Sequence, residues 1–82
     1  MDPAVAAVKR AERAIRREAS RHLHHAAVVL FGSRARGEAG RRSDFDLAIV
    51  PRSEYTAKER LAFIEALDES PDIIYPVDVV DL

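Results

Sequence analysis

The sequence contains no cysteine and no long apolar run, and each absence excludes a class of structure. Without cysteine, the chain has neither a disulfide nor a thiolate-bound metal. No apolar stretch approaches the roughly 20 residues that cross a bilayer, and the N-terminal Met-Asp-Pro with its charged continuation does not resemble a signal peptide. Tyr55 and Tyr75 are too few and too far apart to form a base-stacking platform. We therefore expect a cytoplasmic protein without membrane attachment and without direct binding of nucleic acid.

The length and the charge distribution limit how the chain can be organised. Its 82 residues predict a single domain, 1–82, because the chain is too short for two hydrophobic cores. A domain of this size buries only about 60% of the surface of its unfolded chain, so a partner or a second copy can complete its apolar surface. Residues 1–42 hold ten Lys/Arg and four Asp/Glu, whereas residues 43–82 hold three and ten. Such a dipolar chain can steer a charged partner.

Helical and strand patterns alternate along the chain. Asp2 and Pro3 are typical of a helix start, and Thr56 with Glu59 has the spacing of a capping box. Pro76 would interrupt a central ladder, so the last strand should begin after it. The pattern predicts, in chain order, a helix to about Arg21, a strand over 26–31, a short helix that Ser33 caps and that ends near Gly37 to Gly40, a strand over 44–50, a helix to about Leu67 and a strand from Val77. This order predicts an α/β layer, with helices packed against a small sheet.

The most informative motif lies between residues 30 and 50. An apolar run ends at Gly32 and Ser33, where the glycine permits close backbone approach and a helix start offers free N–H groups to a phosphate. Asp44 and Asp46 begin a second apolar run, and alternate residues of a strand share a face. Converging carboxylates repel each other unless a cation lies between them, and a divalent cation is the usual solution. A phosphate-binding backbone beside metal-binding carboxylates is the combination of groups that nucleotidyl transfer requires.

Each part of this motif also has a simpler interpretation. Gly-Ser before a helix is most often only an N-cap, and Asp-x-Asp before a strand can be a turn with solvated acids. The loop is not a Walker P-loop, because Glu38 and Ala39 stand where Lys and Ser/Thr would be required. The combination of the two parts at this spacing favours a site.

The combination resembles the nucleotidyltransferase superfamily that includes DNA polymerase beta. The fuller string, Gly-Ser-Arg-Ala-Arg-Gly followed by Ser-Asp-Phe-Asp-Leu, resembles its smallest branch, the minimal nucleotidyltransferases (MNT). The resemblance implies a mixed sheet with helices on one face. It also implies a third carboxylate in the run Val77 to Leu82, at Asp78, and a phosphate-binding arginine at the Gly-Ser-x-x-Arg-Gly position, Arg36.

The resemblance further implies a chemistry and a partner. Asp44, Asp46 and Asp78 would bind two Mg²⁺ ions, with Gly32, Ser33 and Arg36 on the phosphates of a nucleotide, ATP in our prediction. Members of the MNT branch typically act as antitoxins to HEPN-domain proteins. The predicted reaction is transfer of AMP to a hydroxyl of a HEPN partner protein, with a homo- or hetero-oligomer as the expected assembly.

Strand parity agrees with this third carboxylate. If Val77 and Val79 face the core, Asp78 faces the opposite side, which is the side of Asp46. Val80 and Leu82 share that side with it, so a partner that covers these two residues can complete the site.

Two other clusters of charge have weaker functional signals. Arg10, Arg13, Arg17 and Arg21 form one basic stripe at helical spacing, which is either a solvated face or a docking face for an acidic partner. His22, His24 and His25 have no carboxylate or cysteine at ligand spacing, so a metal site there is not expected. Two competing functions also remain for the chain as a whole, a non-catalytic antitoxin with a vestigial nucleotide site and a nucleotidyltransferase for a small molecule such as an aminoglycoside.

Overall fold

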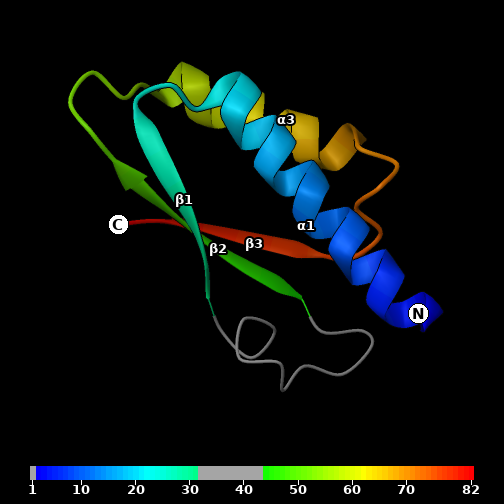
Figure 1. The fold of residues 1–82 in the computed structure, drawn as a ribbon. Coiled ribbons are helices and arrows are strands. Elements are labelled where there is room, and N and C mark those ends of the chain that lie inside the picture. The colour runs from blue at the N-terminus through cyan, green and yellow to red at the C-terminus, as the bar shows by residue number, and fades with distance from the viewer. Residues whose placement is uncertain (1, 32–43) are drawn as a thin grey trace.

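Two helices lie over one face of a three-stranded sheet in the computed structural model, which describes residues 2–31 and 44–82 (Figure 1). In chain order the elements are α1 (Pro3–His22), β1 (Ala26–Phe31), β2 (Phe45–Pro51), α3 (Ala57–Glu69) and β3 (Val77–Asp81). Neither helix in these ranges is long and apolar enough to span a membrane. The predicted fold class, α/β with a small mixed β-sheet and helices on one face, is confirmed.

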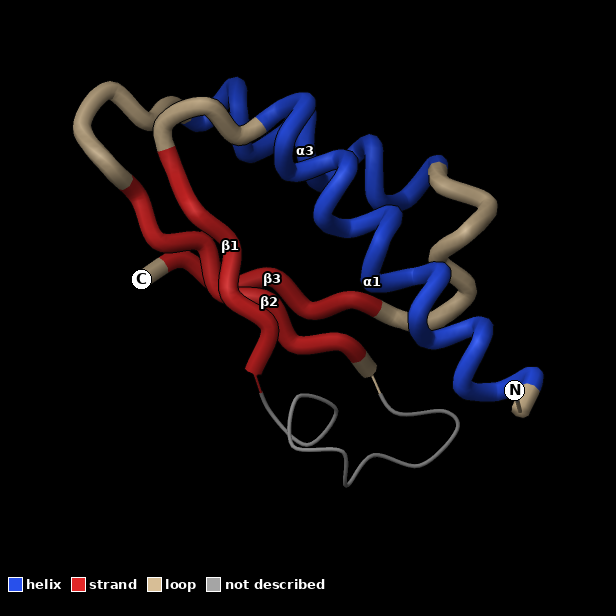
Figure 2. Tube along the Cα trace, viewed as in Figure 1, coloured by secondary structure: helices blue, strands red, loops and turns tan. Residues whose placement is uncertain are grey.

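The sheet is mixed, and β2 is its central strand. Figure 2 shows the strands in red on one side of the two helices, which are blue. β1 runs antiparallel to β2, with Val28 opposite Ile49, and β3 runs parallel to β2, with Asp46 opposite Asp78. Parallel neighbours need a crossover connection, and α3 provides it between β2 and β3. The expected strand over 26–31 and the expected start at Val77 are both confirmed, and residues 73–75 lie outside the strands.

The hydrophobic core lies between the sheet and the helices. Phe45, Leu47 and Ile49 alternate along β2 and are almost completely buried, as a central strand covered on one face requires. Against them pack the buried residues of the helices, Ala11 and Ile15 from α1 and Phe63 and Leu67 from α3. Because Phe45, Leu47 and Ile49 point toward the helices, the residues between them point to the other face of the sheet.

The boundaries of α1 follow from its terminal residues. The Asp2 carboxylate accepts a hydrogen bond from the Ala4 backbone N–H at 2.8 Å. Pro3 has no backbone N–H, so the first turn of the helix has one fewer donor to satisfy. At the other end, the Leu23 N–H donates to the Ala19 carbonyl at 2.8 Å, where the backbone turns to an extended conformation. Glu18 is buried on the inner side of the helix, and its carboxylate lies 3.1 Å from the Arg21 guanidinium. The helix that the sequence predicts from Pro3 to about Arg21 is therefore confirmed.

The start of α3 corrects one detail of the sequence analysis. Thr56 caps the helix as expected, because its hydroxyl accepts from the Glu59 N–H at 3.3 Å. The Glu59 carboxylate, however, does not complete a capping box. It accepts from the backbone N–H groups of His24 and His25 at 2.8 and 3.0 Å, and it lies 2.9 Å from Nδ1 of His25. Glu59 thus ties the start of α3 to the turn after α1, and α3 continues to Glu69, two residues beyond the predicted end.

This contact changes the acidity of Glu59. Burial alone would raise the pKa of its carboxyl group. The hydrogen bonds from the His25 ring and from the backbone of His24 and His25, together with the charge of His25, outweigh burial and lower the pKa from 4.5 to about 2. The ionised carboxylate is therefore the form that the fold requires.

Candidate active site

The candidate site lies on the face of the sheet opposite to α1 and α3, which we call the open face because neither of these helices covers it. By strand alternation it is formed by Ala27, Val29 and Phe31 of β1, Asp46, Ala48 and Val50 of β2, and Asp78 and Val80 of β3, with Leu82 following. The strand register arranges these residues in rows across the sheet. One row is Phe31–Asp46–Asp78 and the next is Val29–Ala48–Val80. The only acids of the open face in the described strands therefore stand together in its end row.

Asp46 and Asp78 are direct register partners on adjacent parallel strands, and we call this pair the carboxylate row. Adjacent strands are about 4.8 Å apart, so the two side chains leave the backbone side by side. Asp46 is half-buried and Asp78 is exposed. Asp44 is exposed and lies one residue before β2, where the Phe45 N–H donates to the Pro76 carbonyl at 2.9 Å and extends the pairing of the two strands. The predicted parity of Asp78 with Asp46 is thus realised in the sheet.

The electrostatics of the carboxylate row distinguish it from the other acids of the fold. Among the described residues no basic side chain pairs with Asp46 or Asp78, whereas Asp81, three residues further along β3, lies 2.9 Å from the Arg60 guanidinium on the helix side. Two unpaired carboxylates at strand spacing repel each other, and a hard divalent cation with oxygen ligands relieves this repulsion. The donor set of the row therefore fits Mg²⁺.

Of the three predicted carboxylate ligands, the structure places only Asp46 and Asp78 side by side. The ranges 2–31 and 44–82 contain no group of three acidic or histidine side chains close enough to hold a metal ion, so Asp44 does not join Asp46 and Asp78 in a ready three-carboxylate cluster. Gly32, Ser33 and Arg36 lie outside the described residues, as does the short helix expected after Ser33. Their assignment to the phosphates of a nucleotide therefore stays a prediction from the sequence.

The other charged clusters of the sequence have structural partners. Within the basic stripe, Arg17 pairs with Asp72 at 3.4 Å and Arg21 pairs with the buried Glu18 at 3.1 Å, so half of the stripe has acidic partners within the fold. His25 forms the contact with Glu59 and lies 3.6 Å from Glu54. The sequence analysis missed the role of Glu59 because the Thr56–Glu59 spacing already had an explanation in a capping box.

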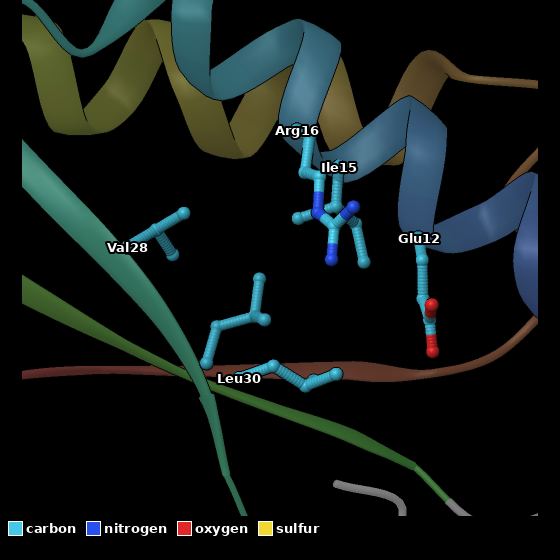
Figure 3. Close-up of a pocket in the computed structure, with 6 residues that line it drawn as sticks. Glu12, Ile15, Arg16, Val28 and Leu30 are labelled. Carbon is cyan, nitrogen blue, oxygen red and sulfur yellow. The ribbon is translucent and has the colours of Figure 1, made fainter.

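A separate cavity of about 150 Å³ lies on the helix side of the sheet, between α1 and the edge strand β1 (Figure 3). Ile15 and Arg16 point into it from α1, and Val28 and Leu30 of β1 lie opposite. Val28, Leu30 and Leu47 line it from the helix side of the sheet, whereas Asp46 and Asp78 are on the other face. The cavity therefore has no part in the candidate site, and no motif of the sequence indicated it.

Comparison with known proteins identifies the family. The family described as "Polymerase beta, Nucleotidyltransferase" matches residues 13–82, which include all three strands, α3 and the second half of α1. No curated protein and no solved structure matches the chain. Nucleotidyl transfer in this superfamily generally uses Mg²⁺, in agreement with the donor set of Asp46 and Asp78. The chain belongs to the polymerase beta nucleotidyltransferase family.

Proposed function

We propose that this nucleotidyltransferase domain transfers AMP from ATP to a hydroxyl group on a partner protein. The observation that carries the proposal is the register pairing of Asp46 and Asp78, which sets side by side two carboxylates that no basic side chain of the described residues pairs with, at one end of the open face. Because α1 and α3 lie on the opposite face of the sheet, neither helix blocks the access of a protein acceptor to the carboxylates. A small acceptor would instead favour an enclosed pocket that buries most of its surface.

The proposed chemistry divides between two groups of residues. Asp46 and Asp78, with Asp44, are the residues that would hold Mg²⁺, which when bound neutralises the charge that develops on the phosphates. Gly32, Ser33 and Arg36 bind the phosphate oxygens in this proposal. The acceptor oxygen forms a bond to the α-phosphorus while the bond from that phosphorus to pyrophosphate breaks, and pyrophosphate leaves. Asp78 takes or orients the proton of the acceptor hydroxyl.

The resemblance to the MNT branch supports a particular partner and purpose. We propose that the acceptor is a HEPN-domain ribonuclease toxin and that AMP transfer to its hydroxyl neutralises it, so that this protein acts as its antitoxin. Covalent modification explains why an antitoxin would retain the aspartates, since a protein that inhibits by occlusion alone has no need for them.

The test uses ATP labelled on the α-phosphate. The protein is incubated with labelled ATP and Mg²⁺ in a lysate of its source cells, beside the variants Asp46→Asn and Asp68→Asn. Asp68 is an exposed acid of α3 on the helix side, so its substitution removes the same charge at a distance from the open face. We expect a labelled protein band with the wild type and with Asp68→Asn, and none with Asp46→Asn.

The other outcomes point to the competing functions. Release of pyrophosphate without a labelled protein would indicate a small-molecule acceptor. Neutralisation of the partner that survives the Asp46→Asn substitution would indicate a non-catalytic antitoxin, and the proposal of covalent modification would then be wrong.

A further inference from the structure

Beyond the carboxylate row, the open face is apolar. Five of the large hydrophobic residues that remain exposed belong to it: Val29, Phe31, Val50, Val80 and Leu82. In the row next to the carboxylates, Val29 and Val80 are 48% and 44% exposed and flank the small side chain of Ala48. An exposed apolar patch that is continuous with acidic groups is typical of a surface that binds a partner.

The position of the patch relative to the carboxylate row is fixed by the sheet. Rows on one face of a sheet are two residues apart along the strand, which is about 6.6 Å. Val29, Ala48 and Val80 therefore lie about 6.6 Å from the row of Asp46 and Asp78, and Val50 lies about 13 Å from it. The carboxylates stand in the end row, so the apolar rows extend from them in one direction only. A molecule seated along these rows reaches the carboxylates at one of its ends.

The size of the open face indicates what kind of partner it fits. Three strands at about 4.8 Å spacing and three rows at about 6.6 Å give an area of roughly 300 Å². A stable protein–protein interface buries about 800 Å² on each partner. The open face alone is thus too small to hold a second copy of this chain in a stable dimer. It matches a short segment that binds transiently and leaves after reaction.

We propose that the open face is the docking surface for an extended segment of the acceptor protein, in which aliphatic side chains stand two and four residues from the modified hydroxyl. An extended segment repeats its same-side residues every 6.6 Å or so, which equals the spacing of the rows. Side chains two and four residues from the hydroxyl then lie over the Val29–Val80 row and over Val50, while the hydroxyl lies at Asp46 and Asp78. The inference rests on the proposed function, because it names the acceptor of the same reaction.

The experiment measures binding separately from transfer. The probe is a synthetic blocked peptide with one tyrosine, valines two and four residues after it, and serine or lysine elsewhere. A control peptide of the same composition carries the valines one and three residues after the tyrosine, which places them on the opposite side. Each peptide is titrated into ¹⁵N-labelled protein with Mg²⁺ and a non-hydrolysable ATP analogue, and the amide resonances of Val29, Ala48 and Val80 are followed by NMR.

The chain offers a matched set of variants for this titration. Val29→Thr and Val80→Thr keep the β-branched shape that a strand favours and remove one methyl group each from the open face. Val5→Thr is the control, since Val5 is a valine of α1 with nearly the same exposure, 45%. We expect roughly fourfold weaker binding for each open-face substitution, no change for Val5→Thr, and at least roughly tenfold weaker binding of the control peptide.

The outcomes separate this inference from the proposed function. Shifts of resonance confined to the open face, with the expected effects of spacing and substitution, support the docking surface. Equal binding of the two peptides, no binding, or shifts centred on the helices would overturn it, even if a lysate protein is labelled. Conversely, if the peptide binds the open face but no lysate protein receives label from α-labelled ATP, the docking surface stands and protein nucleotidylation does not.

Discussion

Replacement of Asp78 by asparagine should separate the electrostatic cost of the carboxylate row from its role in catalysis. Asp46 and Asp78 are register partners, so their charges are about 5 Å apart at strand spacing. Two like charges at this distance repel by about 1 kcal/mol in a dielectric close to that of water, which suits exposed groups. At physiological salt the Debye length is about 8 Å, which reduces the repulsion to about 0.5 kcal/mol. Asp78→Asn should therefore stabilise the metal-free protein by about 1 kcal/mol at low salt and by about 0.5 kcal/mol at physiological salt. The same substitution should abolish nucleotidyl transfer.

The matched control for this substitution lies on the same strand. Asp81 is three residues further along β3, faces the helices and pairs with Arg60 at 2.9 Å. Loss of an exposed ion pair of this kind costs about 0.2–1 kcal/mol, so Asp81→Asn should destabilise the protein where Asp78→Asn stabilises it. Both variants make the same chemical change, and only the surroundings of the carboxylate differ.

Urea unfolding in the absence of divalent metal measures both effects. At low salt the midpoint should rise for Asp78→Asn and fall for Asp81→Asn, and the gain for Asp78→Asn should nearly vanish in 1 M salt, where the Debye length is about 3 Å. Addition of Mg²⁺ should stabilise the wild type and have a smaller effect on Asp78→Asn. If the two substitutions destabilise the protein alike, or if the gain persists in 1 M salt, the repulsion argued for the carboxylate row is not there.

Three further predictions concern stability. Because the pKa of Glu59 is about 2 in the folded protein and 4.5 ordinarily, the wild type should lose stability as the pH falls from about 4.5 to 2, and Glu59→Gln should flatten this dependence in urea titrations. The hydroxyl of Tyr55 is buried without a hydrogen-bond partner among the described residues, and burial raises its pKa, so Tyr55→Phe should raise the melting temperature by a few degrees in calorimetry. Phe63 is fully buried in the core, so Phe63→Ala should cost about 3–5 kcal/mol and leave a largely unfolded chain by circular dichroism.

The fold could be predicted where local signals and the hydrophobic pattern agree. Asp2 and Pro3 give α1 its start, and the alternation of Phe45, Leu47 and Ile49 gives β2 its buried face. Both features act over a few residues and are visible in the sequence. The start of β3 was predictable for the opposite reason, because Pro76 cannot donate to a ladder.

The contacts between helices and strands could not be predicted from local sequence signals. The partners of Glu59 are the backbone N–H groups of His24 and His25, which are 35 and 34 residues away in the sequence. Local spacing assigned the same carboxylate to its own helix, because a capping box and a tertiary contact begin with the same residues. The end of α3 at Glu69, in contrast, follows from a local signal, because Pro71 disfavours a helical conformation of Ser70, which is extended in the structure.

The candidate site could be predicted only in part from the sequence. Strand parity predicts which face Asp46 and Asp78 share, but only the strand order and register make them neighbours. Parity could not show that Asp44 precedes the strand instead of belonging to it. The apolar rows beside Asp46 could be foreseen in part, since Val80 follows from the parity of β3, whereas Val29 needs the pairing of β1 with β2.

The most direct test of the central claim locates the metal–nucleotide complex on the protein. Mn²⁺, which accepts the same carboxylate ligands as Mg²⁺ and broadens nearby NMR signals, is titrated with a non-hydrolysable ATP analogue into ¹⁵N-labelled protein. The account predicts that the amide signals of Asp46 and Asp78 broaden first, that those of Glu59 and Leu61 on the helix side remain sharp, and that Asp46→Asn removes the effect. Broadening centred on Glu59 and His25, or on Glu18, with the signals of Asp46 and Asp78 unchanged, would contradict the assignment of the open face as the site of nucleotidyl transfer.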